Sequence, residues 1–87
     1  MDEAELRLQL GERVKYFRQL SKFTQAQLAE KADLSVNYVS EIETGMASPT
    51  LKTLLKLAQA LNVEIEELFN FGKRQTSKKL KVEREME

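Results

Sequence analysis

The first part of the chain mixes apolar and charged residues with the period of a helix. Its apolar positions are spaced by three or four residues: Leu6, Leu10, Val14, Phe17, and Leu20 or Ser21. This spacing puts them on one face of a helix at about residues 4–21. Charged residues occupy the opposite face, so the pattern predicts an amphipathic helix that packs on one side.

Residues that favour helix ends predict a second, shorter helix. Thr24 suits an N-cap, and Gln27 stands three residues later in the capping-box position. The helix that they begin is expected to end at Lys31 or Ala32. Asp33 then falls where the chain must turn.

Two further helices follow, and each has its own cap. Ser35 is a suitable N-cap for a third helix, Val36–Glu43. Gly45 suits the left-handed position after that helix. Thr50 predicts the start of a fourth helix, Leu51–Leu61.

The fourth predicted helix is apolar on nearly every side, so we expect it to be the central helix of the core. Its apolar residues are Leu51, Leu54, Leu55, Leu57, Ala58 and Leu61. Asn62 suits a left-handed cap, and a short fifth helix is expected at Ile65–Asn70. No strand pattern interrupts the series. Residues 1–71 are therefore predicted to form one all-α domain, a compact five-helix bundle.

The composition changes at Gly72, where a charged tail of residues 72–87 begins. Its apolar residues, Leu80, Val82 and Met86, alternate with polar ones, which fits an edge strand. The lysine and glutamate content fits a helix about as well. A solvated, largely disordered tail is the third interpretation, and all three stay open.

Composition narrows the classes of function. The chain has 87 residues, enough for one small domain, and it contains no cysteine and no histidine. Thiolate metal sites, disulfides and the commonest general base are thus missing, and we expect no enzyme activity, no metal and no cofactor. No apolar run approaches the roughly 20 residues of a membrane span. The acidic N-terminus lacks the apolar core of a signal peptide, which predicts a cytoplasmic protein with no membrane partner.

The charges balance in number but not in position. Lysine and arginine number 14, and so do aspartate and glutamate, which gives a formal net charge of zero. A zero net charge counts mildly against nucleic-acid binding, but the distribution matters more than the sum. Basic residues gather at Arg13, Lys15, Arg18, Lys22, Lys73, Arg74, Lys78, Lys79 and Lys81. Acidic residues gather at Asp2, Glu3, Glu5, Glu64, Glu66, Glu67 and the C-terminal end, so we expect faces of opposite sign.

The second and third predicted helices fit a helix-turn-helix. Ala29 and Ala32 are small enough for two short helices to cross with their backbones close together. Asp33 is among the few residues that tolerate the positive φ of such a turn. Val39 and Ile42 would anchor the third helix on the core and leave its other side facing outward. Any small helical bundle uses these residue types, so it is the combination of spacing, caps and turn that favours a helix-turn-helix.

The segment from Leu10 to Phe69 resembles the lambda-repressor/Cro-like helix-turn-helix family of prokaryotic transcriptional regulators. The likeness is carried by TQAQLAEKA for the second helix, LSVNYVSEIETG for the recognition helix, and SPTLKTLLKLAQALNVEIEELF for the last two helices. Asp33 departs from the glycine usual in the family's turn, which is expected to cost a little stability. Glu64 stands where a small capping residue is common, so the last helix is expected to start loosely.

The outward side of the third helix carries the residues predicted to read DNA bases, namely Val36, Asn37, Ser40 and Glu41. The amide of Asn37 can pair bidentately with adenine, and the side chain of Val36 can meet a thymine methyl group. Glu41 would repel phosphate but can accept a bond from cytosine N4; a simply solvated role stays open. The expected partner is double-stranded DNA.

A second set is predicted to hold DNA phosphates: Gln25, Tyr38, Ser48, Thr50, Lys52 and Thr53. Gln25 stands at the start of the second helix, where exposed backbone N–H groups favour an anion, and the resemblance implies the same role. Most of the others surround the start of the fourth helix. Tyr38 fits a ring packed on the domain surface equally well. Few of these groups are charged, so we expect a modest salt dependence.

The resemblance also implies an ion pair between Arg18, in the first helix, and Glu43, at the end of the third. Such a pair costs desolvation, and removing one partner hurts more than the pair helps. We interpret the pair as structural, although Arg18 could also lend charge toward a phosphate.

An apolar cluster near the end of the domain is predicted to be the contact of a homodimer: Ile65, Leu68, Phe69 and Phe71. It is larger than a short terminal helix needs for docking. The alternative is that the cluster packs on the core of its own protomer. Dimers on two half-sites are the standard way for a small module to gain specificity.

Two classes of function fit these features of the sequence. The first is a sequence-specific DNA-binding transcriptional regulator that acts as a dimer on palindromic operators. The second is an antitoxin-like or adaptor protein, whose tail binds a protein partner and whose DNA binding is autoregulatory.

Overall fold

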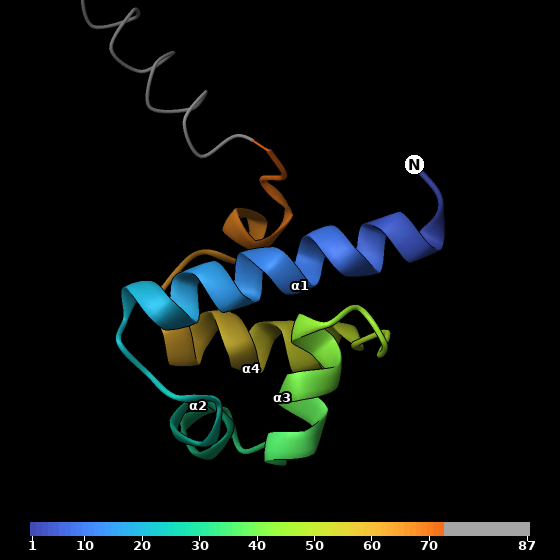
Figure 1. Ribbon diagram of the computed structural model, residues 1–87. Helices are drawn as coiled ribbons and strands as arrows, with labels where there is room; N and C mark the ends of the chain where they lie inside the picture. The colour runs from blue at the N-terminus through green and yellow to red at the C-terminus, as the bar shows by residue number, and fades with distance from the viewer. Residues whose placement is uncertain (73–87) are drawn as a thin grey trace, which may run out of the picture.

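The computed structural model of the protein describes residues 1–72, which fold into four α-helices and a short 3-10 helix (Figure 1). The elements are α1 (Glu3–Leu20), α2 (Gln25–Ala32), α3 (Val36–Glu43), α4 (Leu51–Leu61) and η1 (Ile65–Phe69). Residues 1–72 contain no strand, which confirms the all-α prediction for this part of the chain. The predicted tail contributes almost nothing to the described residues, so its three interpretations lie outside them.

Helix ends form where the sequence predicts them. Thr24 accepts a hydrogen bond from the backbone of Gln27, whose side chain bonds back to the Thr24 N–H group, completing the predicted capping box. Asp33 and Asn62 adopt left-handed backbones with φ of 58° and 59°. A second capping box, formed by Asp2 at the start of α1, was not predicted. Local side-chain chemistry therefore sets most of the helix boundaries.

The predicted fifth α-helix is wrong in type. Ile65–Phe69 forms a 3-10 helix of five residues, and Glu64 gives it no side-chain cap. Backbone bonds run over three residues, from the Glu67 N–H to the Glu64 carbonyl and from the Asn70 N–H to the Glu67 carbonyl. A segment this short without a capping side chain cannot satisfy the end groups of an α-helix, and the tighter turn satisfies them locally.

The core lies where the helices meet. In Figure 1, α1 crosses the molecule with η1 on one side and with α2 and α3 on the other. α1 packs against α3, α4 and η1, and α2 packs against α3 and α4. The largest fully buried side chains are Leu28, Ile42, Leu57, Leu68, Val14 and Val39. These side chains come from all five elements, so the helix-turn-helix is held by one shared core.

α4 contributes to the core as expected, but not all of its apolar residues are buried. Leu51 and Leu55 are 78% and 49% exposed. The buried side of α4 consists of Thr53, Leu54, Leu57, Ala58 and Leu61. α4 therefore packs on one side, as an amphipathic helix does, and its outer side carries two leucines.

Arg13 lies inside the domain, contrary to its expected place among the surface charges. Only 3% of the Arg13 surface is exposed to solvent. The Nε group donates to the carbonyl of Glu67 at 3.0 Å, and the guanidinium lies 4.7 Å from the centre of the Phe17 ring. A buried charge is tolerated where hydrogen bonds and a ring face replace water. Arg13 thus joins α1 to η1.

Gly11 lets α1 and α3 approach with backbone against backbone. A Cβ atom at this position would lie 2.3 Å from the carbonyl oxygen of Ile42 and 2.7 Å from that of Glu43. Because backbone atoms cannot move aside as a side chain can, only glycine fits here without shifting one of the helices.

We expect Gly11→Ala to destabilise the domain by about 2 kcal/mol. The overpacking costs about 3 kcal/mol, while alanine gains about 1 kcal/mol in helix propensity. Denaturant unfolding checks this value. The matched control is Glu12→Ala, at the exposed next position, which should change the free energy of unfolding by less than about 0.5 kcal/mol. A stabilised Gly11→Ala variant would contradict the close approach.

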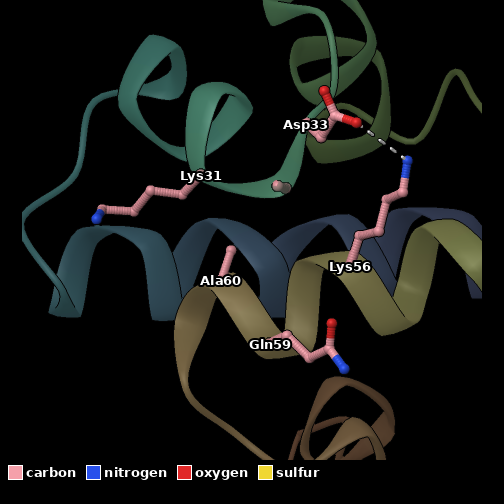
Figure 2. Close-up of a pocket in the computed structure, with 6 residues that line it drawn as sticks. Lys31, Asp33, Lys56, Gln59 and Ala60 are labelled. Carbon is pink, nitrogen blue, oxygen red and sulfur yellow. Dashed lines mark ion pairs between the residues drawn. The ribbon is translucent and has the colours of Figure 1, made fainter.

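A shallow groove runs between the turn after α2 and the outer side of α4 (Figure 2). Lys56 Nζ lies 3.9 Å from Asp33 Oδ2 across it. In Figure 2 the side chains of Lys31 and Gln59 point away from this pair, so the polar groups do not converge on one point. The Asp33 side chain is 97% exposed, and an ion pair so open to water contributes little to stability.

Candidate DNA-binding surface

The helix-turn-helix is built as the residue types predict. Ala29 and Ala32 are buried where α2 meets its neighbours, and Val39 and Ile42 are buried on the inner side of α3. The N–H of Leu34 donates to the carbonyl of Ala29 at 2.8 Å, which closes the turn around the left-handed Asp33. The outer side of α3 is therefore fixed by apolar contacts on its inner side.

The four residues predicted to read bases lie on that outer side. Val36, Asn37 and Glu41 are exposed, and Ser40 is half-buried. Positions 36, 37, 40 and 41 are neighbours on a helix surface, because residues four apart share a face. They form one stripe with an amide, a hydroxyl, a carboxylate and an apolar branch, which are the groups that can distinguish base edges in the major groove.

The loop before α4 and the first turn of α4 carry part of the predicted phosphate set. Ser48, Thr50 and Lys52 are exposed. The side chain of Thr50 accepts from the Thr53 N–H and caps α4. An exposed helix N-terminus with hydroxyls and an amine nearby can hold an anion.

Thr53 does not belong to this exposed set, and this prediction is corrected. The residue is buried. Its hydroxyl oxygen accepts from the Thr50 hydroxyl at 3.1 Å and from the Tyr38 hydroxyl at 3.5 Å. Thr53 lies one helical turn before Leu57 on the buried side of α4, which explains its burial. Tyr38 is half-buried and packs against the core, in agreement with the packed alternative for its ring.

A hydrogen-bonded network joins the start of α2 to the end of α3. Arg18 donates to both carboxylate oxygens of Glu43, from Nε at 2.6 Å and from Nη2 at 3.1 Å. The side chain of Glu43 is 2% exposed, so this is a buried ion pair. Gln25 Nε2 also donates to Glu43 Oε1, at 3.0 Å. The family resemblance predicts the pair of Arg18 with Glu43, whereas the bond from Gln25 was not predicted.

The predicted dimer residues separate into an inner and an outer group. Leu68 is fully buried in its own protomer, which corrects its place in a contact between protomers. Phe69 is 40% exposed, and Ile65 and Phe71 are half-buried. The rings of Phe69 and Phe71 meet edge to face with centroids 5.9 Å apart. Leu68 therefore belongs to the core, Ile65 and Phe71 pack partly against that core, and Phe69 is the most exposed of the four.

Within residues 1–72, no group of three or more histidine, cysteine, aspartate or glutamate side chains is placed to hold a metal ion. No helix in the same part of the chain combines the length and apolar character needed to cross a membrane.

Comparison with known proteins assigns the family. A protein-family model described as helix-turn-helix matches residues 14–68. The chain belongs to this family, the lambda-repressor/Cro-like helix-turn-helix regulators, which is a family of transcription regulators rather than enzymes.

Two relatives with curated names are repressors or regulators. The chain is 45% identical to the immunity repressor protein of Bacillus phage phi105 over 56 residues, which is 64% of this chain and 39% of the relative. It is 39% identical to the HTH-type transcriptional regulator ImmR of Bacillus subtilis over 72 residues, which is 83% of this chain and 55% of the relative. The chain thus spans only part of the length of these relatives.

Solved structures share the fold. The restriction-modification controller protein C.AhdI from Aeromonas hydrophila matches with a TM-score of 0.72 and 35% identity, over 72% of this chain and 96% of that one. A complex of the SinR and SinI proteins matches with a TM-score of 0.69 and 30% identity, over 88% of this chain and 77% of that one. The helix-turn-helix described above is therefore an arrangement found in known regulators.

Proposed function

We propose that the protein is a cytoplasmic, sequence-specific DNA-binding transcriptional regulator that acts as a homodimer on palindromic operators. The observation that carries this proposal is the outward polar stripe of α3, which Val39 and Ile42 hold in place from the buried side. The names of the curated relatives, a phage repressor and a bacterial regulator, support the same activity.

In this proposal α3 enters the major groove and its stripe reads base edges. Asn37 donates to and accepts from adenine through its amide, and Val36 covers a thymine methyl group. Ser40 and Glu41 lie one helical turn further on, where a hydroxyl can bond to several bases and a carboxylate selects cytosine. Because Val36, Asn37 and Glu41 are exposed and Ser40 is half-buried, these residues can meet DNA without repacking of the core.

Phosphate contacts then set the position of α3 in the groove. We place them at the first turns of α2 and α4, where Gln25, Thr50 and Lys52 stand beside backbone N–H groups. Ser48 adds a hydroxyl from the preceding loop. Only Lys52 in this set carries a charge, so the contacts rely mainly on helix ends and neutral donors.

Asn37→Ala tests the base-reading role. We expect it to weaken binding to the preferred site by about 1–3 kcal/mol and to relax the preference at one base pair, because the bidentate bond to adenine is lost. Selection of binding sites from random DNA, with wild type and variant side by side, measures both effects. An unchanged preference in the variant would exclude Asn37 from base reading.

Lys52→Ala is the matched phosphate-contact variant. It should weaken binding to specific and to random DNA about equally. It should also make the negative slope of log K against log salt less steep by about one, because one fewer counterion is released. Filter binding or fluorescence anisotropy over a range of salt concentrations gives the slope. A loss confined to the specific site would instead make Lys52 a base-reading residue.

We propose that the dimer contact is the aromatic surface of Ile65, Phe69 and Phe71. Two copies of it are well placed to cover each other, because an isologous contact joins the same patch on both protomers. The half-exposed Phe69 ring and its neighbour Phe71 supply the apolar area, and Leu68 fixes the η1 backbone underneath.

The alternative proposal is an antitoxin-like or adaptor protein. In it the charged tail, residues 72–87, binds a protein partner, and DNA binding by residues 1–71 serves autoregulation. One structural neighbour was solved as a complex of two proteins, SinR with SinI, which favours testing for a partner. Purification of the full chain from its own cells decides between them: a stoichiometric second protein supports the adaptor, and its absence supports the stand-alone regulator.

A further inference from the structure

The buried ion pair of Arg18 and Glu43 has a third member, and that member lies on the proposed DNA-binding surface. Gln25 Nε2 donates to Glu43 Oε1 at 3.0 Å, and Gln25 itself is half-buried at the first position of α2. We propose that Glu43 is a positioning residue for Gln25: it holds the Gln25 amide ready for a DNA phosphate. This inference rests on the proposed function and assigns a role to a residue that cannot itself reach DNA.

The direction of the bond follows from the chemistry of the two side chains. An ionised carboxylate only accepts hydrogen bonds, so the NH2 end of the Gln25 amide must face Glu43. That NH2 group has two hydrogens, and one serves Glu43. The second hydrogen remains on the same nitrogen, at the start of α2, where the backbone N–H groups of the first turn also favour an anion.

Arg18 makes this arrangement compatible with a phosphate nearby. A lone buried carboxylate beside the site would repel an anion and would be costly to bury. Arg18 balances its charge with two bonds, of 2.6 Å and 3.1 Å, and its Nη1 donates to the Phe23 carbonyl at 2.8 Å. The carboxylate is thus neutralised and fixed from α1, and the loop before α2 is fixed by the same guanidinium.

Holding the Gln25 side chain in one orientation has a measurable benefit. A free glutamine side chain samples many rotamers, and ordering it on binding reduces affinity. Because Glu43 already orders it in the free protein, less conformational entropy is lost when DNA binds. A purely structural role for the network would give no such dependence of DNA affinity on Glu43.

The test replaces the ion pair by apolar residues of similar size. Exchange of both members of a buried pair is often neutral for stability, so the double variant Arg18→Met, Glu43→Met is expected to fold. It removes the acceptor of Gln25. We expect it to bind a random-sequence 20-base-pair duplex about 3- to 10-fold more weakly than wild type, and we expect Gln25→Ala alone to weaken binding at least as much.

The decisive comparison adds Gln25→Ala to the double variant. If Glu43 acts through Gln25, Gln25→Ala should weaken binding less in the double variant than in wild type, because the benefit of pre-ordering this side chain is already lost. Gln59→Ala, which removes an exposed glutamine of α4, is the matched control and should leave binding unchanged. A folded double variant with wild-type affinity, or a triple variant whose losses add, overturns the proposal.

A second measurement needs no variant. The side-chain amide of Gln25 in the free wild-type protein should be more ordered by NMR relaxation than that of Gln59. Equal mobility of the two amides would overturn the positioning role even if the double variant failed to fold. A wild type that binds no duplex would overturn the proposed function itself, whereas wild-type binding that is indifferent to Gln25 overturns this inference alone.

Discussion

Replacing Arg18 alone by methionine is expected to reduce the free energy of unfolding by about 3–5 kcal/mol, because Glu43 is then left buried without its counter-charge. The Glu43 side chain is 2% exposed and that of Arg18 is 12% exposed, so water can do little to replace the lost counter-charge of Glu43. Within residues 1–72, the other side-chain donor to the Glu43 carboxylate is the neutral amide of Gln25. A small domain has about 5–15 kcal/mol of stability in total, so this single change removes a large part of it.

Denaturant unfolding with an unchanged m-value measures this loss. Lys15→Met is the matched control: it makes the same kind of change at an exposed position of α1 and should shift stability by less than about 0.5 kcal/mol. The Arg18→Met, Glu43→Met double variant should recover most of the loss. If Arg18→Met were no more destabilised than Lys15→Met, the buried pair would not hold α1 against α3.

The second large effect is expected at the proposed dimer contact. Phe71→Lys places a charge in an apolar surface beside Phe69 and should give a folded monomer. Affinity for a palindromic operator should then fall by about 100-fold or more, because the two half-sites are no longer bound by one linked pair of modules. Affinity for a single half-site should stay nearly unchanged, since Phe71 is remote in sequence from the reading stripe of α3.

Sedimentation at micromolar concentration and titration of both DNA duplexes check these expectations. Leu20→Lys is the matched control, because Leu20 is an exposed apolar residue at the C-terminal end of α1, outside the proposed contact. This substitution should leave the assembly intact. A wild type that sediments as a monomer would remove this interface, and so would a Phe71→Lys variant that still dimerises. Phe71 is preferred to Leu68 as the test residue because loss of the fully buried Leu68 would unfold the protomer.

The helices and their caps could be predicted from the sequence because each depends on residues close together in the chain. Thr24 with Gln27, and the left-handed Asp33 and Asn62, are examples whose geometry the structure reproduces. The type of the last helix was less predictable, since five residues without a side-chain cap can form either kind of turn.

Contacts between distant residues could not be predicted in the same way. Arg13 bonds to Glu67, 54 residues away, and Gln25 bonds to Glu43, 18 residues away. Nothing in the local sequence distinguishes Arg13 from a solvated arginine. The exposure of Leu51 and Leu55 was missed for a related reason, because a helix rich in leucine does not reveal how many neighbours will cover it.

The close approach at Gly11 also bears on how such a protein can evolve. α1 supports α3 there through the backbone carbonyls of Ile42 and Glu43, which every amino acid possesses. The exposed residues of the reading stripe contribute nothing to that support. If these residues read bases as proposed, mutation can exchange Asn37 or Glu41 and change the operator that is recognised, while the position of α3 stays the same. The packing of α1 on α3 can thus be conserved while the exposed residues of α3 diverge.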